Sequence, residues 1–351
     1  MAAGRAWVGL AMMLASPTAP QASEVVAGGP LALTLTGFAG VLAHGGDLAR
    51  QREDPDLADG LDFSTDTEVH VLARGRAEAI GLDYGATIEF EADTDEVAQT
   101  DETWLFLRGG WGEARFGDVD GPIDASALGA FTIAAGTGGI DGDVVDALAV
   151  DAILPLTSDT ATKARYYTPA WAGVQLGLGY APAGEDRGDA FAGTDAEFTH
   201  WVEAAATYEA SLDELDLAAS LVGGTAEVAG DGRLWTFYAG GELEHGDLAL
   251  GAGFGVDDRG GAHRRYLNAG FAHWLGPVYA SVTHGRVLDT AGQPGVGTPW
   301  NLVMSADVVL APGLMLAGDL AYFDNDLERT VRDDVGGDRG WVWVAKLELA
   351  F

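Results

Sequence analysis

Residues 80–91 read IGLDYGATIEFE, a run in which apolar residues alternate with polar or small ones. In an extended backbone Ile80, Leu82 and Tyr84 share one face, because successive side chains of a strand point to opposite sides. Asp83 and Glu89 lie on the other face. This period of two predicts a β-strand with one apolar face, and helical periodicity is scarce in the rest of the chain.

Similar segments recur to the end of the chain. Residues 174–180 read VQLGLGY and residues 341–351 read WVWVAKLELAF. We predict sixteen strands, near 31–43, 63–74, 79–91, 102–109, 112–118, 161–168, 173–181, 197–209, 214–222, 233–243, 247–256, 264–274, 277–287, 299–310, 313–323 and 341–351.

The connections between these segments alternate between long and short. The long ones are 44–62, 92–101, 119–160, 182–196, 223–232, 257–263, 288–298 and 324–340. The short ones are 75–77, 110–111, 169–172, 210–213, 244–246, 275–276 and 311–312. A transmembrane up-and-down β-barrel has this pattern, with short periplasmic turns and longer external loops. Lipid offers the backbone no hydrogen bonds, so a sheet that spans it must close on itself.

The composition excludes several classes of protein. The 351 residues include 19 Lys and Arg against 54 Asp and Glu, so the net charge is −35. A sequence pI near 4.2 argues against nucleic acid as a partner. The absence of cysteine excludes disulfide scaffolds and thiolate metal sites.

Residues 1–22 resemble a secretory signal peptide, with Arg5 followed by a short apolar run and small residues up to Ala22. We therefore expect residues 23–351 to be the exported barrel. Many aromatic residues near the strand ends suit the girdles of a membrane barrel, although core aromatics of a soluble β protein are the alternative. They are Trp104, Tyr167, Trp171, Tyr180, Trp201, Tyr208, Trp235, Tyr238, Trp274, Tyr279, Trp300 and Tyr322.

Two motifs are specific. Residues 165–174, RYYTPAWAGV, resemble the "RY-x-S/T-P-x-aromatic-x-G" turn of Gram-negative general porins. The terminal Phe351, after alternating apolar residues, resembles the signal that the barrel-assembly machinery reads. A weaker match, residues 111–118 (WGEARFGD), resembles the strand that leads into the family's constriction loop. The resemblance is to porins of the alphaproteobacterial type.

The resemblance implies a 16-stranded antiparallel up-and-down barrel in the outer membrane of a Gram-negative bacterium, usually a homotrimer. Its third external loop, here 119–160, folds inward and narrows the pore. A basic cluster on the wall then faces an acidic loop. Where many general porins carry Arg after the Tyr-Gly or Phe-Gly of that strand, this chain carries Asp118, which favours cations.

The loop supplies the candidate site. We expect a constriction lined by acidic residues, which would raise the local concentration of cations, with basic residues on the neighbouring wall. A solvated surface loop is the alternative interpretation. The acidic candidates are Asp118, Asp120, Asp124, Asp141, Asp143, Asp146 and Asp151. The basic candidates are Arg74, Arg108, Arg115, Lys163 and Arg165.

We expect no organic cofactor and no catalysis, because the seven histidines show no paired metal-ligand spacing and no nucleophile motif is present. Asp141 and Asp143 form a candidate for weak Ca²⁺ binding, since Ca²⁺ prefers oxygen ligands. The sequence thus predicts a porin for passive diffusion of ions and small hydrophilic solutes, with a preference for cations. The alternatives are a solute-specific channel of the same fold, an outer-membrane enzyme or adhesin, and a soluble exported β-rich binding protein.

Overall fold

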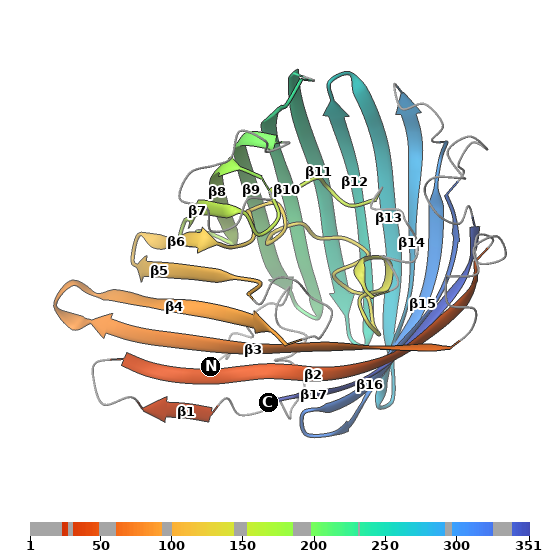
Figure 1. Ribbon diagram of the computed structural model, residues 1–351, viewed down its shortest axis with the longest axis horizontal. Coiled ribbons are helices and arrows are strands. Elements are labelled where there is room, and N and C mark those ends of the chain that lie inside the picture. Colours follow the sequence, from red (N-terminus) through yellow and green to blue (C-terminus); the bar gives the residue numbers. More distant parts are fainter. Residues whose placement is uncertain are drawn as a thin grey trace.

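The computed structural model describes residues 23–26, 31–48, 61–92, 100–143, 153–184, 198–230, 232–291, 297–325 and 339–351. Within them, 17 strands form one antiparallel sheet, and the sheet curves around a central space (Figure 1). The two 3₁₀ turns are η2 (Glu78–Ile80) and η3 (Gly139–Asp141). The strands are β1 (Ser23–Val26), β2 (Leu31–Leu48), β3 (Asp62–Ala77), β4 (Leu82–Glu91), β5 (Thr103–Gly109), β6 (Gly112–Asp118), β7 (Thr162–Tyr167), β8 (Val174–Ala183), β9 (Phe198–Leu212), β10 (Leu215–Val228), β11 (Gly232–His245), β12 (Leu248–Arg259), β13 (Ala262–Leu275), β14 (Val278–Ala291), β15 (Trp300–Ala311), β16 (Leu314–Asp324) and β17 (Arg339–Ala350).

The sheet closes into a barrel. Each strand from β2 to β17 pairs with its sequence neighbours, and β17 pairs with β2 in the register Ala345↔Ala43, so 16 strands form the ring. β17 covers β2 only from Phe38 onward, and β1 pairs with the start of β2 in the register Ser23↔Leu35. Closure therefore gives every strand of the ring two partners, as lipid requires.

All sixteen predicted strands are confirmed, whereas β1 was not predicted. Two predicted long connections are wrong, because 223–232 and 257–263 are mostly strand. β10 continues to Val228 before β11 begins at Gly232, and β12 continues to Arg259 before β13 begins at Ala262. The alternation fades there because these hairpins extend beyond the lipid, where water meets the outer face and an apolar surface is not needed.

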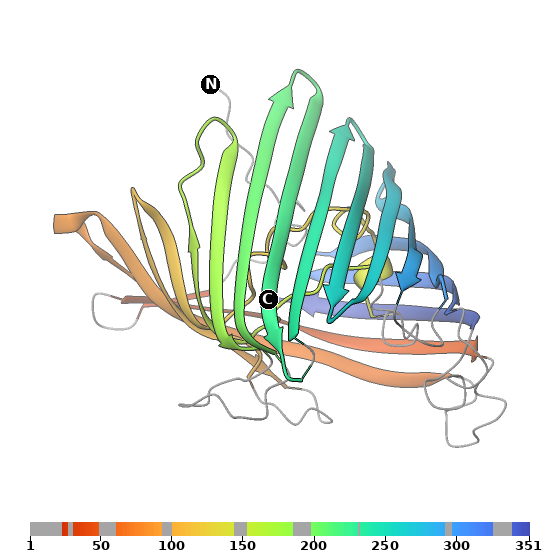
Figure 2. The ribbon, with the colours of Figure 1, turned by 90° about the horizontal axis from the view of Figure 1, so that it is seen from above.

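The barrel wall is uneven in height. β5, β6 and β7 have seven, seven and six residues, whereas β9 to β14 have 12 to 15. The hairpins of the tall side rise well above the rest (Figure 2). No helix among the described residues is long and apolar enough to cross a membrane.

The alternation in sequence becomes two faces of the wall. On β8, Val174, Leu176, Leu178 and Tyr180 are exposed on the outside, while the residues between them face the lumen. The outer aromatics partly confirm the predicted girdle: the ring of Tyr322 lies 5.3 Å from that of Trp300 and 4.9 Å from that of Trp341.

Five of the aromatics assigned to the girdle face the inside of the barrel instead. Trp104 donates to Glu102, and the hydroxyl of Tyr167 lies 3.0 Å from that of Ser126 in the connection after β6. The other three are almost fully buried. Trp201, Tyr238 and Tyr279 are 2%, 0% and 6% exposed. Tyr238 packs among Ile123 and Ile140 of the long connection after β6, together with inner residues of the tall wall. The apolar core of the molecule therefore lies between that connection and the wall.

Candidate functional site

The connection between β6 and β7, residues 119–161, folds into the barrel and follows its inner wall (Figure 1). We call it the inward loop; its described parts are 119–143 and 153–161. Val119, Ile123, Ile133 and Ile140 are almost fully buried. A structureless segment of this length is unusual in a compact domain, and here the wall satisfies its polar backbone.

Side chains of the wall accept hydrogen bonds from the backbone N–H groups of the inward loop. These bonds reach across six strands, β9, β10, β13, β14, β15 and β16, so the loop is fastened around half of the barrel. They run from Ile123 to Glu203 (3.4 Å), Leu128 to Ser220 (3.0 Å), Ala130 to Asn268 (2.9 Å), Ala135 to Ser281 (2.8 Å), Gly136 to Asp307 (3.1 Å) and Thr137 to Asp319 (2.8 Å).

Wall side chains also donate to carbonyl oxygens of the loop. The hydroxyl of Tyr238 donates to Leu128 (3.0 Å), and that of Tyr279 donates to Ile133 (3.1 Å). The loop backbone passes so close to β11 that a Cβ on Gly240 would lie 1.7 Å from the carbonyl oxygen of Leu128. Only glycine allows this approach.

Glu203 on β9 joins the two ends of the inward loop. One carboxylate oxygen accepts from the N–H of Ile123 on the outgoing end, and the other accepts from the N–H of Ser158 on the returning end (2.6 Å). The ammonium of Lys163 donates to the hydroxyl of Ser158 (2.6 Å). Because its two oxygens accept from the two ends of the loop, Glu203 fixes the place where the loop enters and leaves the wall.

The acidic candidates occupy different places. Asp118, at the end of β6, accepts a hydrogen bond from the hydroxyl of Thr162. Asp120 and Asp124 lie at the root of the inward loop, where Asp120 is partly buried and Asp124 is exposed. Asp141 and Asp143 at its far end are exposed to the lumen. Asp146 and Asp151 lie outside the described residues.

Enclosure by the barrel changes the ionisation of these loop carboxyls. Desolvation, assisted by the charge of Glu102, raises the pKa of Asp120 to about 6. Although Asp141 meets the lumen, the protein around it raises its pKa to about 6 as well. Burial, with the charges of Asp120 and Glu203, raises the pKa of Asp124. Burial also raises the pKa of Asp143, while Lys346 opposes the shift with its ammonium 3.7 Å away.

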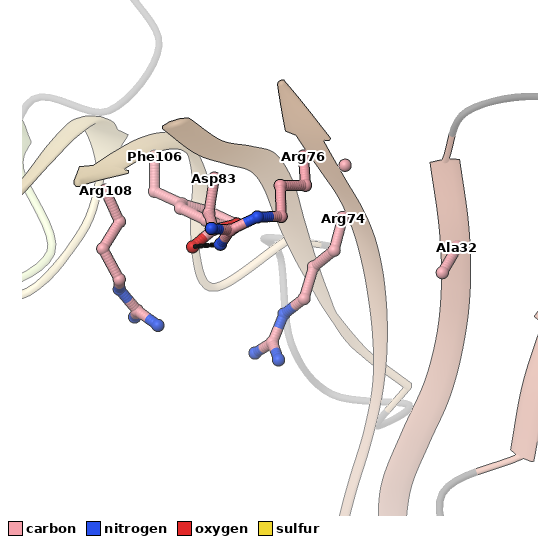
Figure 3. Close-up of a pocket in the computed structure, with 7 residues that line it drawn as sticks. Ala32, Arg74, Arg76, Asp83, Phe106 and Arg108 are labelled. Atoms are coloured by element: carbon pink, nitrogen blue, oxygen red, sulfur yellow. Dashed lines mark hydrogen bonds and ion pairs between the residues drawn. The ribbon is translucent and has the colours of Figure 1, made fainter. Parts of the chain in front are cut away.

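The five basic candidates lie at two places that Glu113 links, since its carboxylate accepts from both Arg108 and Arg115. Arg115, Lys163 and Arg165 lie at the root of the inward loop: Arg165 donates to the carbonyl oxygen of Asp120 (2.7 Å), and Arg115 stacks 4.1 Å from the ring of Trp104. Arg74 and Arg108 instead line a cavity at the end of the barrel where the turns are short (Figure 3). The basic residues therefore extend along the wall from the loop root toward the short turns, and their role in permeation stays a prediction.

The wall formed by β3, β4 and the start of β5 carries an acidic group that we did not predict. On the inner face, His70 Nε2 lies 2.6 Å from a carboxylate oxygen of Glu68, and His70 Nδ1 lies 4.0 Å from Glu89. Glu91 and Asp101 lie close to Glu68. We call Glu68, His70, Glu89, Glu91, Asp101 and Glu102 the acidic wall. The polar positions of the 63–74 and 79–91 alternation were the signal that could have located it.

Two overlapping sets in the acidic wall hold ligand atoms within 4.8 Å of one another: Glu68, His70 and Glu89, and Glu68, Glu91 and Asp101. These are the two such groups found among the described residues, and neither of them includes Asp141 or Asp143. Carboxylates thus line the lumen both on the inward loop and on the wall. Such an arrangement concentrates cations and repels anions.

Comparison with known proteins agrees with this geometry. A family model described as Gram-negative porin matches residues 9–327. Among solved structures, the chain resembles an anion-selective porin from Comamonas acidovorans, with 17% identity, 92% of this chain and 100% of the other covered, and a TM-score of 0.63. A triple mutant of the Rhodopseudomonas blastica porin is similar, with 16% identity, 91% and 100% coverage and a TM-score of 0.60.

OmpT, an outer membrane protein of Vibrio cholerae solved in a trimer form, has 10% identity, 92% and 100% coverage and a TM-score of 0.63. No curated protein sequence matches the chain.

Proposed function

Because this chain belongs to the Gram-negative porin family, and is therefore an outer-membrane channel, we propose that its lumen is a cation-preferring, water-filled path for ions and small hydrophilic solutes. Transport is passive, and no cofactor or catalytic step takes part. The supporting observation is that carboxylates lie on the acidic wall and also on the inward loop within the same barrel.

The name of the Comamonas porin includes anion selectivity, but a likeness at 17% identity concerns the fold. Selectivity depends on the charges that line the pore. In this chain Glu68 and Glu89 lie on the wall and Asp141 and Asp143 on the loop, whereas Arg115 and Arg165 at the loop root are held by Glu113 and by Asp120.

Single-channel recording in a planar bilayer tests the proposal. The refolded chain should give stepwise openings, and its reversal potential in a KCl gradient should have the sign expected for a K⁺-preferring pore. Open channels that prefer Cl⁻ would refute the cation preference but would still support an open channel. Folded barrels without conductance would refute the open path.

We propose a homotrimer, supported by the trimer form named for the Vibrio cholerae neighbour. Native mass spectrometry of the protein in detergent tests it, and a monomer at micromolar concentration would count against it. We also propose that residues 1–22, which lie outside the described residues, are removed as a signal peptide, since they combine Arg5, a short apolar run and small residues up to Ala22. The N-terminal mass of protein from the outer membrane would show this cleavage.

For Asp141 and Asp143 we propose weak Ca²⁺ binding. Both carboxylates meet the lumen, but the Lys346 ammonium 3.7 Å from Asp143 competes for its charge. Titration calorimetry with CaCl₂ on the detergent-solubilised protein should therefore give millimolar affinity, lost in the Asp141→Asn variant. Unchanged binding in that variant would move the site elsewhere.

A further inference from the structure

A cavity of about 420 Å³ lies on the inner wall where β3, β4 and β5 reach the short turns (Figure 3). Arg74 and Arg76 come from the end of β3, Asp83 from the start of β4, and Phe106 and Arg108 from the end of β5. Short turns face the periplasm in outer-membrane barrels. The cavity is therefore at the periplasmic mouth of the lumen, and we call it the arginine pocket.

The three arginines are not equally available. Arg76 is held by Asp83, with both carboxylate oxygens at 2.8 and 3.1 Å, and by Glu78 at 3.1 Å. Arg108 uses Nε and Nη2 on Glu113, which leaves Nη1. Arg74 has no ion-pair partner among the described residues. Its guanidinium and that of Arg108 extend toward the space between them (Figure 3).

This arrangement suits an anion with several oxygens. Guanidinium groups bind phosphate through paired N–H donors, and two of them from different strands can share one dianion. Because Arg76 already neutralises Asp83, that carboxylate does not oppose an incoming anion strongly. Phe106, 5% exposed, forms an apolar side of the cavity, with the Arg108 guanidinium 5.7 Å from its ring centre.

The volume and the charge point to the size of the ligand. A cavity of this volume lies in the range that holds a small organic molecule and exceeds what a bare phosphate ion fills. The pocket also carries three of the 19 basic residues of a chain with a net charge of −35, so it is a local concentration of guanidinium groups.

We propose that the arginine pocket binds the phosphate group of small phosphate monoesters, such as sugar phosphates, as they pass the periplasmic mouth. The inference rests on the proposed open lumen, and it adds a binding step for one class of anionic solute. Arg74 and Arg108 supply the donors, and Phe106 contacts the apolar side of the solute.

Single-channel recording with solute added on the periplasmic side is the first test. Glucose 6-phosphate should reduce the current in a concentration-dependent manner, inorganic phosphate should do so more weakly, and glucose should have little effect. In the double variant Arg74→Gln/Arg108→Gln, half-block should need more than about tenfold more glucose 6-phosphate, because both guanidiniums are lost and one charge-assisted contact alone accounts for about tenfold.

Arg286→Gln is the control, because Arg286 lies on the outer face of β14 and its removal changes the net charge by one unit, as each single arginine substitution in the pocket does. It should leave the block unchanged. Equal block in the native chain and the double variant, or no block of open channels, would overturn the proposal. If the double variant fails to fold, Arg74→Lys, which keeps the charge but not the paired donors, should still weaken the block.

Calorimetric binding of glucose 6-phosphate to the folded protein in detergent separates this proposal from the proposed function. Binding that is lost in the double variant supports the pocket even if no channel opens. Channels that open with K⁺ preference but bind no glucose 6-phosphate would refute the pocket alone.

Discussion

Gly37 and Phe351 exchange two backbone hydrogen bonds, with the N–H of Phe351 2.9 Å from the Gly37 carbonyl oxygen and the N–H of Gly37 3.0 Å from that of Phe351. The last residue of the chain thus completes the seam between β17 and β2. A Cβ on Gly37 would lie 2.2 Å from the Glu68 carbonyl oxygen and 3.1 Å from the Phe351 ring. The seam therefore has no room for a side chain at position 37.

Gly37→Val should destabilise the closed barrel by about 1–3 kcal/mol, the usual range for overpacking. The measurement is the temperature at which the folded band disappears in heat-modifiability electrophoresis. Gly110→Val is the control, because a Cβ at Gly110 would meet nothing within 4 Å. Equal melting of the two variants would show that the seam tolerates a side chain.

Deleting Phe351 should reduce assembly in the outer membrane more than stability in detergent, if the terminal residue is also the signal for the barrel-assembly machinery. The measurement compares the amount of folded protein in outer-membrane fractions with the melting temperature of the purified barrel. A loss of stability with normal assembly would assign Phe351 to the seam alone.

Asn268→Leu should loosen the inward loop. Asn268 accepts from the N–H of Ala130 and donates to the hydroxyl of Tyr238 (3.0 Å), so an apolar replacement leaves buried groups without partners, at a cost of about 1–3 kcal/mol. We expect noisier and larger single-channel currents. Leu267→Met, on the outer face of the same strand, should keep the native current, and an unchanged current in Asn268→Leu would mean that the loop does not depend on this contact.

Asp141→Asn with Asp143→Asn should lower the K⁺ over Cl⁻ permeability ratio, because it removes two carboxylates that meet the lumen. The reversal potential in a KCl gradient measures it. Asp213→Asn is the control, because Asp213 lies on the short β9–β10 turn and its charge is outside the lumen. The backbone at Asp213 is left-handed, with a φ of 56°, and Asn tolerates this conformation. If the control shifts selectivity as much, the loop is not the selective element.

Lys346→Gln should have the opposite effect. The ammonium of Lys346 lies among Asp66, Asp143 and Glu348, at 3.7 Å from Asp143 and 3.2 Å from Glu348. Its removal leaves three carboxylates without their cation, so K⁺ preference should rise while the melting temperature falls. A lower K⁺ preference would mean that these carboxylates do not contribute to the permeation path.

Cation preference should depend on pH. Asp120 and Asp141 have pKa values raised to about 6, so each is ionised above that value and neutral below it. The preference should therefore be full near pH 8 and should decline as the pH falls through 6 toward 5. Reversal potentials measured over this range test it. The Asp120→Asn/Asp141→Asn variant should show a flatter profile, and a native profile that is flat from pH 8 to 5 would contradict the assignment.

The sequence was sufficient to predict the strands of the ring, because lipid outside and water inside impose an alternation of apolar and polar residues on each strand. It was insufficient for the upper parts of β10 to β13, since an outer face in water, as at Glu227 and Asp258, carries no apolar pattern. Backbone pairing continues there without a compositional signal.

The anchors of the inward loop were also beyond sequence reasoning. Asn268 and Asp319 each lie between apolar or small neighbours in mid-strand, and the loop residues that they bind are 138 and 182 positions away. Such pairs depend on closure of the whole barrel. The acidic loop residues were recognisable from composition, but which of them meets the lumen depends on how the loop lies against the wall.

Glu68 and Arg74 lie six residues apart on β3, which is about 20 Å along an extended strand. The acidic wall and the arginine pocket therefore follow one another along the pore rather than facing each other across it. The fixed charge therefore differs along the conduction path: it is negative at the acidic wall and close to neutral at the arginine pocket, where carboxylates pair with the arginines. Such a charge gradient rectifies current, as the junction of a semiconductor diode does. A barrel inserted in one direction should accordingly pass more current at one voltage polarity than at the other.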